Sequence, residues 1–264
     1  MLIESPRNKT LKNIRRLRRC KGDQALLEGP HLIDEALAAG LSLRSVLMTP
    51  ELRASPLGRR LEGRLASPVQ VVAPSLLDEL ADSDSPRGLL AVAELPRPGV
   101  EGLPRDRPGS FLYLERVQDP GNLGAMARVA EAAGARGLAL SPGTVHPNHP
   151  RALRASAGSL LRIPLARDVE LPRLRQQLSP LEPRFVCLAP RGGADLYRVE
   201  TAPTSVLLLG SEGRGLSPET EGLADLRLTI PLAAPVESLN VTVAAAVALF
   251  ELRRARSGSF SPRS

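Results

Sequence analysis

The sequence predicts an α/β protein, with a parallel sheet in its C-terminal part and a small α/β domain before it. Three observations lead to this prediction. Short continuous apolar runs recur after residue 110, separated by segments long enough for crossover helices. Strand-like and helix-like patterns also follow one another in residues 1–95. A stretch rich in proline and glycine, residues 96–109, separates the two parts and is expected to be a linker.

The N-terminal domain, residues 1–95, begins with a basic segment. A helix is expected from residue 30 to residue 39, because Gly40 follows as a helix-terminating residue. Short apolar patterns predict strands at residues 46–48, 69–72 and 89–93. A helical turn is expected at residues 75–81.

The C-terminal domain, residues 110–254, carries the apolar runs typical of buried parallel strands. These runs are residues 111–115, 137–140, 185–189, 206–210 and 226–231. A helix with one apolar face is expected after Asn122, ending at Gly134, and a second is expected after Asn240. Residues 255–264 have no periodicity and are expected to be a basic tail.

Composition restricts the class of protein. The 264 residues are 42% hydrophobic, which excludes a disordered chain, and the net charge of +7 favours a polyanionic partner such as nucleic acid. The alternative is that the charge serves only solubility. Cys20 and Cys187 are far apart and support neither a disulfide framework nor a zinc site. With no membrane-length apolar run and no signal peptide, a cytoplasmic location is expected.

The first motif is the turn at residues 118–122. It is expected to deliver Asn122 to the N-cap of a helix, where its side-chain oxygen accepts a free backbone N–H. Arg128 then lies one turn beyond Gly124 on the same face, near a helix N-terminus that attracts phosphate. Capping and a solvated arginine are a sufficient alternative explanation.

The second motif, Gly-Ser-Glu-Gly-Arg-Gly at residues 210–215, follows a continuous apolar run. It is therefore expected at the carboxyl end of a buried strand, where open α/β sheets bind ligands. Its glycine spacing does not fit the dinucleotide fingerprint or a Walker loop. A plain tight turn is the alternative. Ser217 and Pro218 are expected to start another helix.

The third motif consists of Ile-Pro-Leu at residues 230–232 and the segment at residues 235–241, where Asn240 is a capping candidate for the last helix. His146 and His149 lie among prolines without carboxylate or cysteine partners, so they are expected to be loop residues and no metal is expected.

Taken together, the order and spacing of these motifs resemble the SpoU/TrmH branch of the SPOUT methyltransferases. The resemblance implies methyl transfer from S-adenosylmethionine to a ribose 2′-hydroxyl of RNA, with ribosomal RNA as the first expected substrate and transfer RNA as the second. It also implies a deep trefoil knot and a homodimer whose active sites form at the subunit interface. Neither follows from periodicity.

The resemblance assigns roles to individual residues. The catalytic residues it implies are Arg128, Asn122, Ser238 and Asn240. The residues implied to hold the cofactor, largely through backbone groups, are Gly210, Glu212, Gly213, Ile230, Leu232, Leu239 and Ala189. The family commonly has glycine where this chain has Ala234.

The N-terminal domain resembles the substrate-binding domain found ahead of many SpoU enzymes, which is similar to the ribosomal L30e/L7Ae type of RNA-binding fold. The matching residues lie at 5–8, 12–19, 27–29 and 32–36, and residues 151–159 also resemble the family. RNA contacts are therefore expected from Arg7, Asn8, Lys12, Arg16 and Arg154. The alternative for the basic segment is a solvated helix face.

Three alternatives stay open on the sequence. Arg128 is either a general base or a phosphate clamp with water accepting the proton, since a guanidinium does not readily lose a proton. The chain could also be a non-catalytic RNA-binding protein that has kept the fold. Five intact motif residues argue against this: Asn122, Arg128, Glu212, Ser238 and Asn240. The third alternative is a base methylase of the same superfamily.

Overall fold

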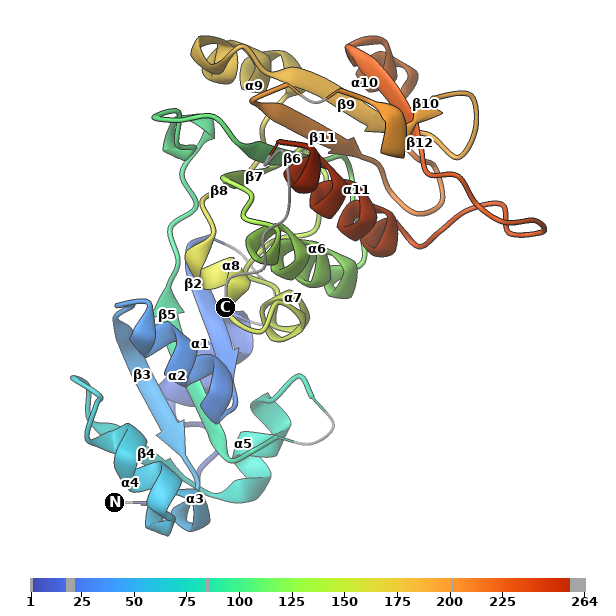
Figure 1. The fold of residues 1–264 in the computed structure, drawn as a ribbon. Helices are drawn as coiled ribbons and strands as arrows, with labels where there is room; N and C mark the ends of the chain where they lie inside the picture. The colour runs from blue at the N-terminus through green and yellow to red at the C-terminus, as the bar shows by residue number, and fades with distance from the viewer. Residues whose placement is uncertain (1, 18–21, 84–85, 201, 257–264) are drawn as a thin grey trace, which may run out of the picture. The chain divides into compact units, whose positions relative to one another are not determined.

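The computed structural model describes residues 2–17, 22–83, 86–200 and 202–256, and contacts within it divide the chain into two compact units (Figure 1). The first unit contains residues 1–96 and 146–162, and the second contains residues 97–145 and 163–264. Cys20 and residues 257–264 of the expected tail lie outside the described residues.

The described residues of the first unit form a five-stranded sheet in the order β1-β4-β3-β5-β2. β1, β4 and β3 run parallel, whereas β5 is antiparallel to both β2 and β3. The strands are β1 (Leu2–Ile3), β2 (Gln24–Glu28), β3 (Leu43–Met48), β4 (Val69–Val72) and β5 (Leu89–Glu94). The three strands expected from the sequence are confirmed as β3, β4 and β5. β1 and β2 are additions, and the two-residue length of β1 hides it from pattern analysis.

Helices cover this sheet. They are α1 (Lys9–Leu17), α2 (Pro30–Ala38), α3 (Pro50–Ala54), α4 (Pro56–Glu62), α5 (Pro74–Leu80), α7 (Pro150–Ala155) and α8 (Ser159–Arg162). Gly40 has a φ of +73°, which confirms its expected position just beyond the end of α2. α7 packs against β2, so residues 146–162 group with the first unit although they follow the strand β7 (Gly137–Leu140) of the second unit in sequence.

One helix of the first unit separates apolar from basic residues. Leu11 and Ile14 of α1 are fully buried against the sheet, in a cluster with Leu47 and Leu90. Lys12 and Arg16 lie one turn apart on the exposed side of the same helix. Burial of the apolar side therefore determines that the basic side faces solvent.

The described residues of the second unit form a seven-stranded parallel sheet in the order β10-β12-β9-β11-β6-β7-β8. The strands are β6 (Ser110–Leu114), β7 (Gly137–Leu140), β8 (Leu165–Ala166), β9 (Arg184–Leu188), β10 (Ala194–Asp195), β11 (Ser205–Leu209) and β12 (Leu226–Thr229). All five expected strands and their parallel direction are confirmed. The short edge strands β8 and β10 are additions.

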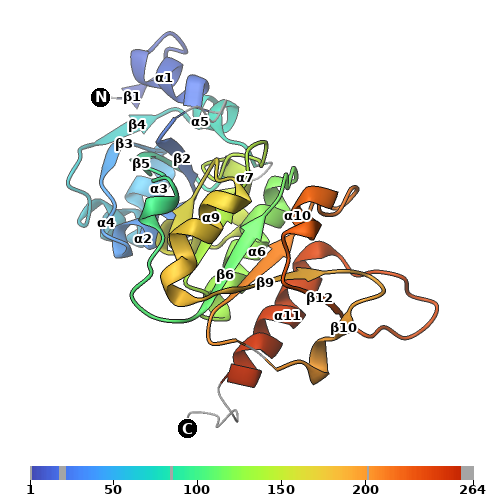
Figure 2. The same ribbon diagram turned by 90° about the horizontal axis from the view of Figure 1, so that it is seen from above.

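Helices cover both faces of this sheet. α6 (Pro120–Ala132) and α11 (Val241–Arg256) lie side by side on one face, and α9 (Leu171–Leu178) and α10 (Pro218–Gly222) lie on the other (Figures 1 and 2). Phe111 and Tyr113 of β6 point toward α9, where they join Leu174 in one core cluster. Because side chains alternate along a strand, both faces of the central strands are buried.

Short 3₁₀ turns complete the second unit: η1 (Val100–Gly102), η2 (Ser179–Leu181) and η3 (Leu196–Arg198). The first lies in the proline-rich stretch expected to be a linker. Val100 and Leu103 are only 3% exposed and belong to the core of the second unit. The prolines and glycines therefore coincide with the boundary between the units, while two apolar side chains attach the stretch to the second unit. No helix in the described ranges is long and apolar enough to cross a membrane.

The expected N-cap of α6 is wrong by three residues. Asp119, not Asn122, is the N-cap, and its Oδ1 accepts a hydrogen bond from the backbone N–H of Asn122 at 2.9 Å. Pro120 explains the shift, because a proline is favoured at the first helical position and a carboxylate suits the cap before it. The side chain of Asn122 is therefore not used for capping and can contact other segments.

Candidate active site

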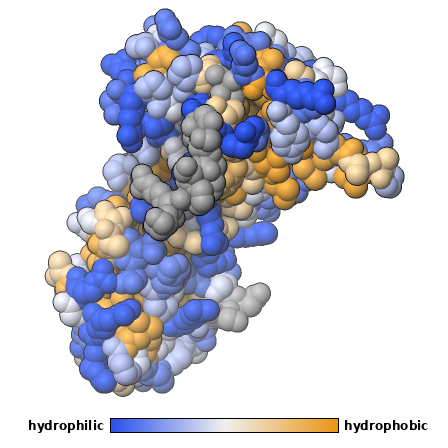
Figure 3. Space-filling view, viewed as in Figure 1, coloured by the Kyte–Doolittle hydropathy of each residue, from blue (hydrophilic) through white to orange (hydrophobic). Residues whose placement is uncertain are grey.

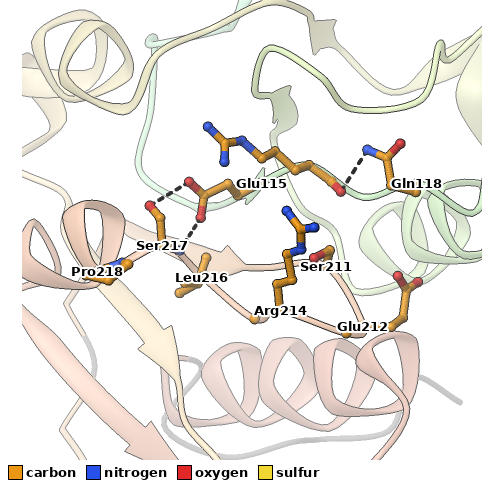
Figure 4. Close-up of a pocket in the computed structure, with 11 residues that line it drawn as sticks. Glu115, Gln118, Ser211, Glu212, Arg214, Leu216, Ser217 and Pro218 are labelled. Carbon is orange, nitrogen blue, oxygen red and sulfur yellow. Dashed lines mark hydrogen bonds between the residues drawn. The ribbon is translucent and has the colours of Figure 1, made fainter.

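The first two motifs meet at the carboxyl edge of the parallel sheet. β6 and β11 are neighbours, and their last residues, Leu114 and Leu209, are paired in register. The loops that follow them enclose a pocket of about 680 Å³, shown in Figure 4. The residues that line it are Glu115, Arg116, Gln118, Ser211, Glu212, Gly213, Arg214, Gly215, Leu216, Ser217 and Pro218.

The side chain of Asn122 links the first motif to the second motif and to the helix that follows the third motif. Its Nδ2 donates a hydrogen bond to the carboxylate of Glu212 in the second motif. Its Oδ1 accepts a hydrogen bond from Oγ1 of Thr242 at 3.3 Å, at the start of α11. An amide is suited to this position because it donates and accepts at the same time. Thr242 was missed in the sequence, where nothing distinguishes it from other threonines in the first turn of a helix.

The second motif folds back on itself directly after β11. The backbone N–H of Gly215 donates to the carbonyl oxygen of Ser211 at 2.8 Å. A Cβ atom on Gly210 would lie 2.0 Å from the backbone carbon of Gly215, so only glycine fits there. Gly215 has a φ of +66°, which also favours glycine. The loop therefore presents backbone groups at the sheet edge, with Glu212 and Gly213 at its exposed tip.

A buried carboxylate that the sequence analysis missed fixes the end of this loop. Glu115 accepts hydrogen bonds from the backbone N–H and Oγ of Ser217, both at 2.8 Å, and from Oγ1 of Thr220 at 2.9 Å. Figure 4 shows the two bonds to Ser217. These donors offset the cost of burying the carboxylate. The sequence feature that could have identified Glu115 is its position, because it is an acidic residue directly after a buried apolar run.

The third motif runs from β12 to α11. Asn240 is the cap expected for α11, because its Oδ1 accepts from the backbone N–H of Thr242 at 2.8 Å. Ser238 is exposed, while Ile230, Leu232 and Leu239 are half-buried. Ala189 directly follows β9, the strand beside β11, and its backbone N–H donates to Leu228 at 2.8 Å. The backbone segments expected to hold a cofactor thus follow β9, β11 and β12, which are neighbours in the sheet.

Exposed arginines accompany these loops. Arg116 and Arg214 line the pocket, and Arg128 lies on the exposed face of α6. The Arg128 guanidinium has no hydrogen bond or ion pair with any residue that the structure describes. Guanidinium groups suit phosphate because they offer parallel N–H donors.

The expected RNA contacts of the first unit fall into two groups. Lys12 and Arg16 are exposed on α1, and Arg7 is exposed just before it. Asn8 instead caps α1, since its Oδ1 accepts from the backbone N–H of Thr10 at 2.8 Å. An RNA contact from Asn8 would therefore have to use its remaining donor, the side-chain NH₂.

Arg154 has structural partners. Its guanidinium contacts the carboxylate of Glu28 at 3.2 Å and that of Asp82 at 2.8 Å. The Glu28 side chain is only 3% exposed, so this pair joins α7 to β2 inside the first unit. Any RNA contact of Arg154 would compete with two carboxylates.

The two histidines act in local turns. Nδ1 of His149 accepts from the backbone N–H of Arg151 at 3.1 Å, at the start of α7, and Nδ1 of His146 accepts from that of Asn148 at 3.0 Å. Among the described residues, no group of three His, Cys, Asp or Glu side chains could hold a metal ion.

Replacing Glu115 tests the support of the second loop. Glu115→Ala leaves three donors of Ser217 and Thr220 without their acceptor, so we expect a loss of about 3 kcal/mol in the free energy of unfolding. Glu115→Gln keeps one carbonyl acceptor and should lose less. Glu219→Ala, an exposed position in α10, is the control. Urea denaturation measures the three values, and an alanine variant as stable as the wild type would show that these bonds are unimportant.

Comparisons with known proteins agree with this geometry. Residues 109–250 match the SpoU rRNA Methylase family, and residues 8–91 match the MRM3-like substrate binding domain. An uncharacterized tRNA/rRNA methyltransferase of Synechocystis is 34% identical, over 98% of this chain and 96% of the relative. The 23S rRNA (guanosine(2553)-2′-O)-methyltransferase RlmP of Bacillus subtilis is 31% identical, over 95% of this chain and 98% of the relative.

A solved structure extends the agreement to the fold. The SpoU methyltransferase AviRb from Streptomyces viridochromogenes, in complex with the cofactor AdoMet, superimposes with a TM-score of 0.85 and 26% identity. The alignment covers 96% of this chain and 100% of that one. The family model matches more than half of the chain, and the contacts of Asn122 connect the motifs within the matched part. The chain therefore belongs to the SpoU rRNA Methylase family.

Proposed function

We propose that this protein transfers a methyl group from S-adenosylmethionine to a ribose 2′-hydroxyl of ribosomal RNA. The observation that carries the proposal is the junction at Asn122, which links the first two motifs to the start of α11 beside a pocket at the carboxyl edge of the sheet. The names of the Bacillus subtilis and Streptomyces relatives, a 23S rRNA 2′-O-methyltransferase and an AdoMet-bound SpoU enzyme, support it. Transfer RNA is the second candidate substrate, because the Synechocystis relative is named for both RNAs.

The loops at the sheet edge fit a cofactor held by backbone groups. Gly210 allows the backbone of Gly215 to approach closely, which shapes the loop after β11. The other proposed cofactor segments follow β9 at Ala189, follow β12 at Ile230 and Leu232, and precede α11 at Leu239. S-adenosylmethionine supplies an already activated methyl group, so the reaction needs no metal. Gly213 at the loop tip is part of the same proposed cofactor site.

The remaining task of the chain is to orient and deprotonate the ribose hydroxyl. Burial raises the pKa of the Tyr113 phenol in β6, so this group stays protonated at neutral pH. A guanidinium group does not readily lose a proton, which makes it a poor general base. We therefore favour Arg128 as a phosphate clamp that aligns the ribose while water accepts the proton, with Ser238 and Asn240 near the reacting atoms.

Arg128→Ala tests this assignment. We expect the single-turnover rate of methylation to fall by about 100-fold or more, because a charge that stabilises the transition state is lost. Cofactor affinity by calorimetry should stay unchanged. Arg128→Lys should also fail, since an ammonium lacks the two-pronged contact with phosphate. Arg173→Ala, on the exposed side of α9, is the control. A near-normal rate in the alanine variant would make Arg128 an ordinary surface residue.

We assign RNA binding to the first unit. Lys12 and Arg16 carry it, one turn apart on α1 with Arg7 beside them. A protein that neutralises phosphates releases counterions, so the affinity should depend strongly on salt.

The double variant Lys12→Gln and Arg16→Gln should bind RNA more weakly, and the slope of log K against log salt should fall by about two. Filter binding over a salt series measures both. The control is Arg53→Gln in the same unit, whose guanidinium pairs with Glu62 at 2.7 Å. An unchanged slope would mean that α1 makes no phosphate contacts.

We further propose a homodimer with the active sites at its interface, and the trefoil knot that the family resemblance implies. Exposed apolar side chains support the dimer. Val243 and Phe250 are each 48% exposed and lie two turns apart on α11, and Val236 precedes the helix. Figure 3 shows apolar residues gathered where α11 and the preceding loop lie.

A ribosomal RNA substrate also favours a cytoplasmic location for the protein.

Phe250→Glu tests the dimer. A buried carboxylate without a partner should prevent association, so sedimentation should give a monomer and methyl transfer should be lost. Phe250→Leu should keep both. Leu57→Glu, at an exposed apolar residue of the first unit, is the matched control. A dimeric Phe250→Glu variant would place the interface elsewhere.

A further inference from the structure

Four arginines from separate segments line a second pocket in the second unit. The pocket has a volume of about 640 Å³. The four residues are Arg107, Arg136, Arg253 and Arg256. The lining also includes Gly109, directly before β6, and Pro203, just before β11. The pocket therefore lies at the amino ends of these strands, at the sheet edge opposite to the Asn122 junction.

Two of these guanidinium groups contain buried donors without an acceptor. The Arg136 side chain is 13% exposed, and one of its terminal nitrogens donates to the carboxylate of Asp106. Its Nε is buried and has no hydrogen-bond partner among the residues that the structure describes, and neither has Nη1 of Arg256. Such unpaired donors are costly, and each unpaired group in a folded protein calls for an explanation.

The position of Arg136 is fixed by its surroundings. Its backbone N–H donates to the carbonyl oxygen of Ser110 at 2.7 Å. A Cβ on Gly109 would lie 2.4 Å from Cγ of Arg136, so the glycine makes room for the arginine stem. The guanidinium is thus held at the pocket before any ligand arrives, which lowers the entropy lost on binding.

Among the described residues that line this pocket, four are arginines and none is acidic. Asp106 is the acidic partner of Arg136 and is itself 68% exposed. The guanidinium of Arg253 donates to the carbonyl oxygen of Ala132 at 3.2 Å, so this arginine caps the C-terminal end of α6. Burial and the neighbouring Arg253 lower the pKa of Arg256. An anion between Arg136 and Arg256 would supply both the missing acceptors and the missing negative charge.

We propose that this pocket binds a phosphate group, with Arg136 and Arg256 as its principal ligands. Guanidinium groups offer parallel N–H donors that match phosphate oxygens, and two of them supply the positive charge that suits a dianionic group. The phosphate comes either from an RNA backbone or from a free polyphosphate. It is not the phosphate beside the methylated ribose, because the five residues of β6 place the two sheet edges roughly 17 Å apart.

Calorimetry with inorganic pyrophosphate on the full-length protein tests the proposal. Arg256→Gln and Arg136→Gln should each weaken pyrophosphate binding about tenfold or more, because each removes charge-assisted hydrogen bonds. Arg254→Gln is the matched control, since Arg254 lies on the same turn of α11 and pairs with Glu251 at 2.5 Å. Because Arg136 is buried, thermal melting must first show that its variant folds, and Arg256→Gln provides the second measurement.

A short RNA hairpin, titrated with the same variants, separates the two sources of phosphate. This arm alone rests on the proposed function. If RNA affinity falls with pyrophosphate affinity, the pocket holds an RNA phosphate, and if only pyrophosphate affinity falls, it holds a free polyphosphate. Absent pyrophosphate binding, or equal binding by the wild type and Arg256→Gln, overturns the proposal. Cofactor affinity should be unchanged in both variants, so a failure of the proposed methyl transfer would be seen separately.

Discussion

The candidate active site depends on one side chain, the amide of Asn122. It donates to Glu212 and accepts from Thr242, so a single residue on α6 orients the loop after β11 and the start of α11. These segments are 90 and 120 residues away in sequence. An aspartate or a leucine in this position could satisfy at most one of the two contacts. The rest of the site is arranged around this bifunctional group, and Asp119 leaves it available by capping the helix.

A second constraint comes from the sheet. All of its strands run in parallel, so every loop that carries a motif emerges at the same edge. Glu115 then ties the far end of the second loop back to β6 through three hydrogen bonds. One end of the loop is thus held by Asn122 and the other by a buried carboxylate. Backbone groups between them are kept in place, as binding of a cofactor by the main chain requires.

The arginines are distributed according to what surrounds them. Arg154 is paired with two carboxylates and stabilises the first unit. Arg128 is exposed, and the second pocket holds Arg136 and Arg256 with donors that lack acceptors. The net charge of +7 therefore does not by itself indicate which arginines bind a polyanion. Only the partners of each guanidinium distinguish a structural arginine from one that is available to a phosphate.

The sequence by itself determined the α/β class, the five long parallel strands, the cap at Asn240 and the three motifs. These features are local, since apolar periodicity and turn residues act over a few positions. The tertiary structure decided the rest. The cap at Asp119, the roles of Glu115 and Thr242, and the association of residues 146–162 with the first unit all depend on contacts between distant segments. Such contacts leave no periodic signal, because they exist only after the sheet brings strand ends together.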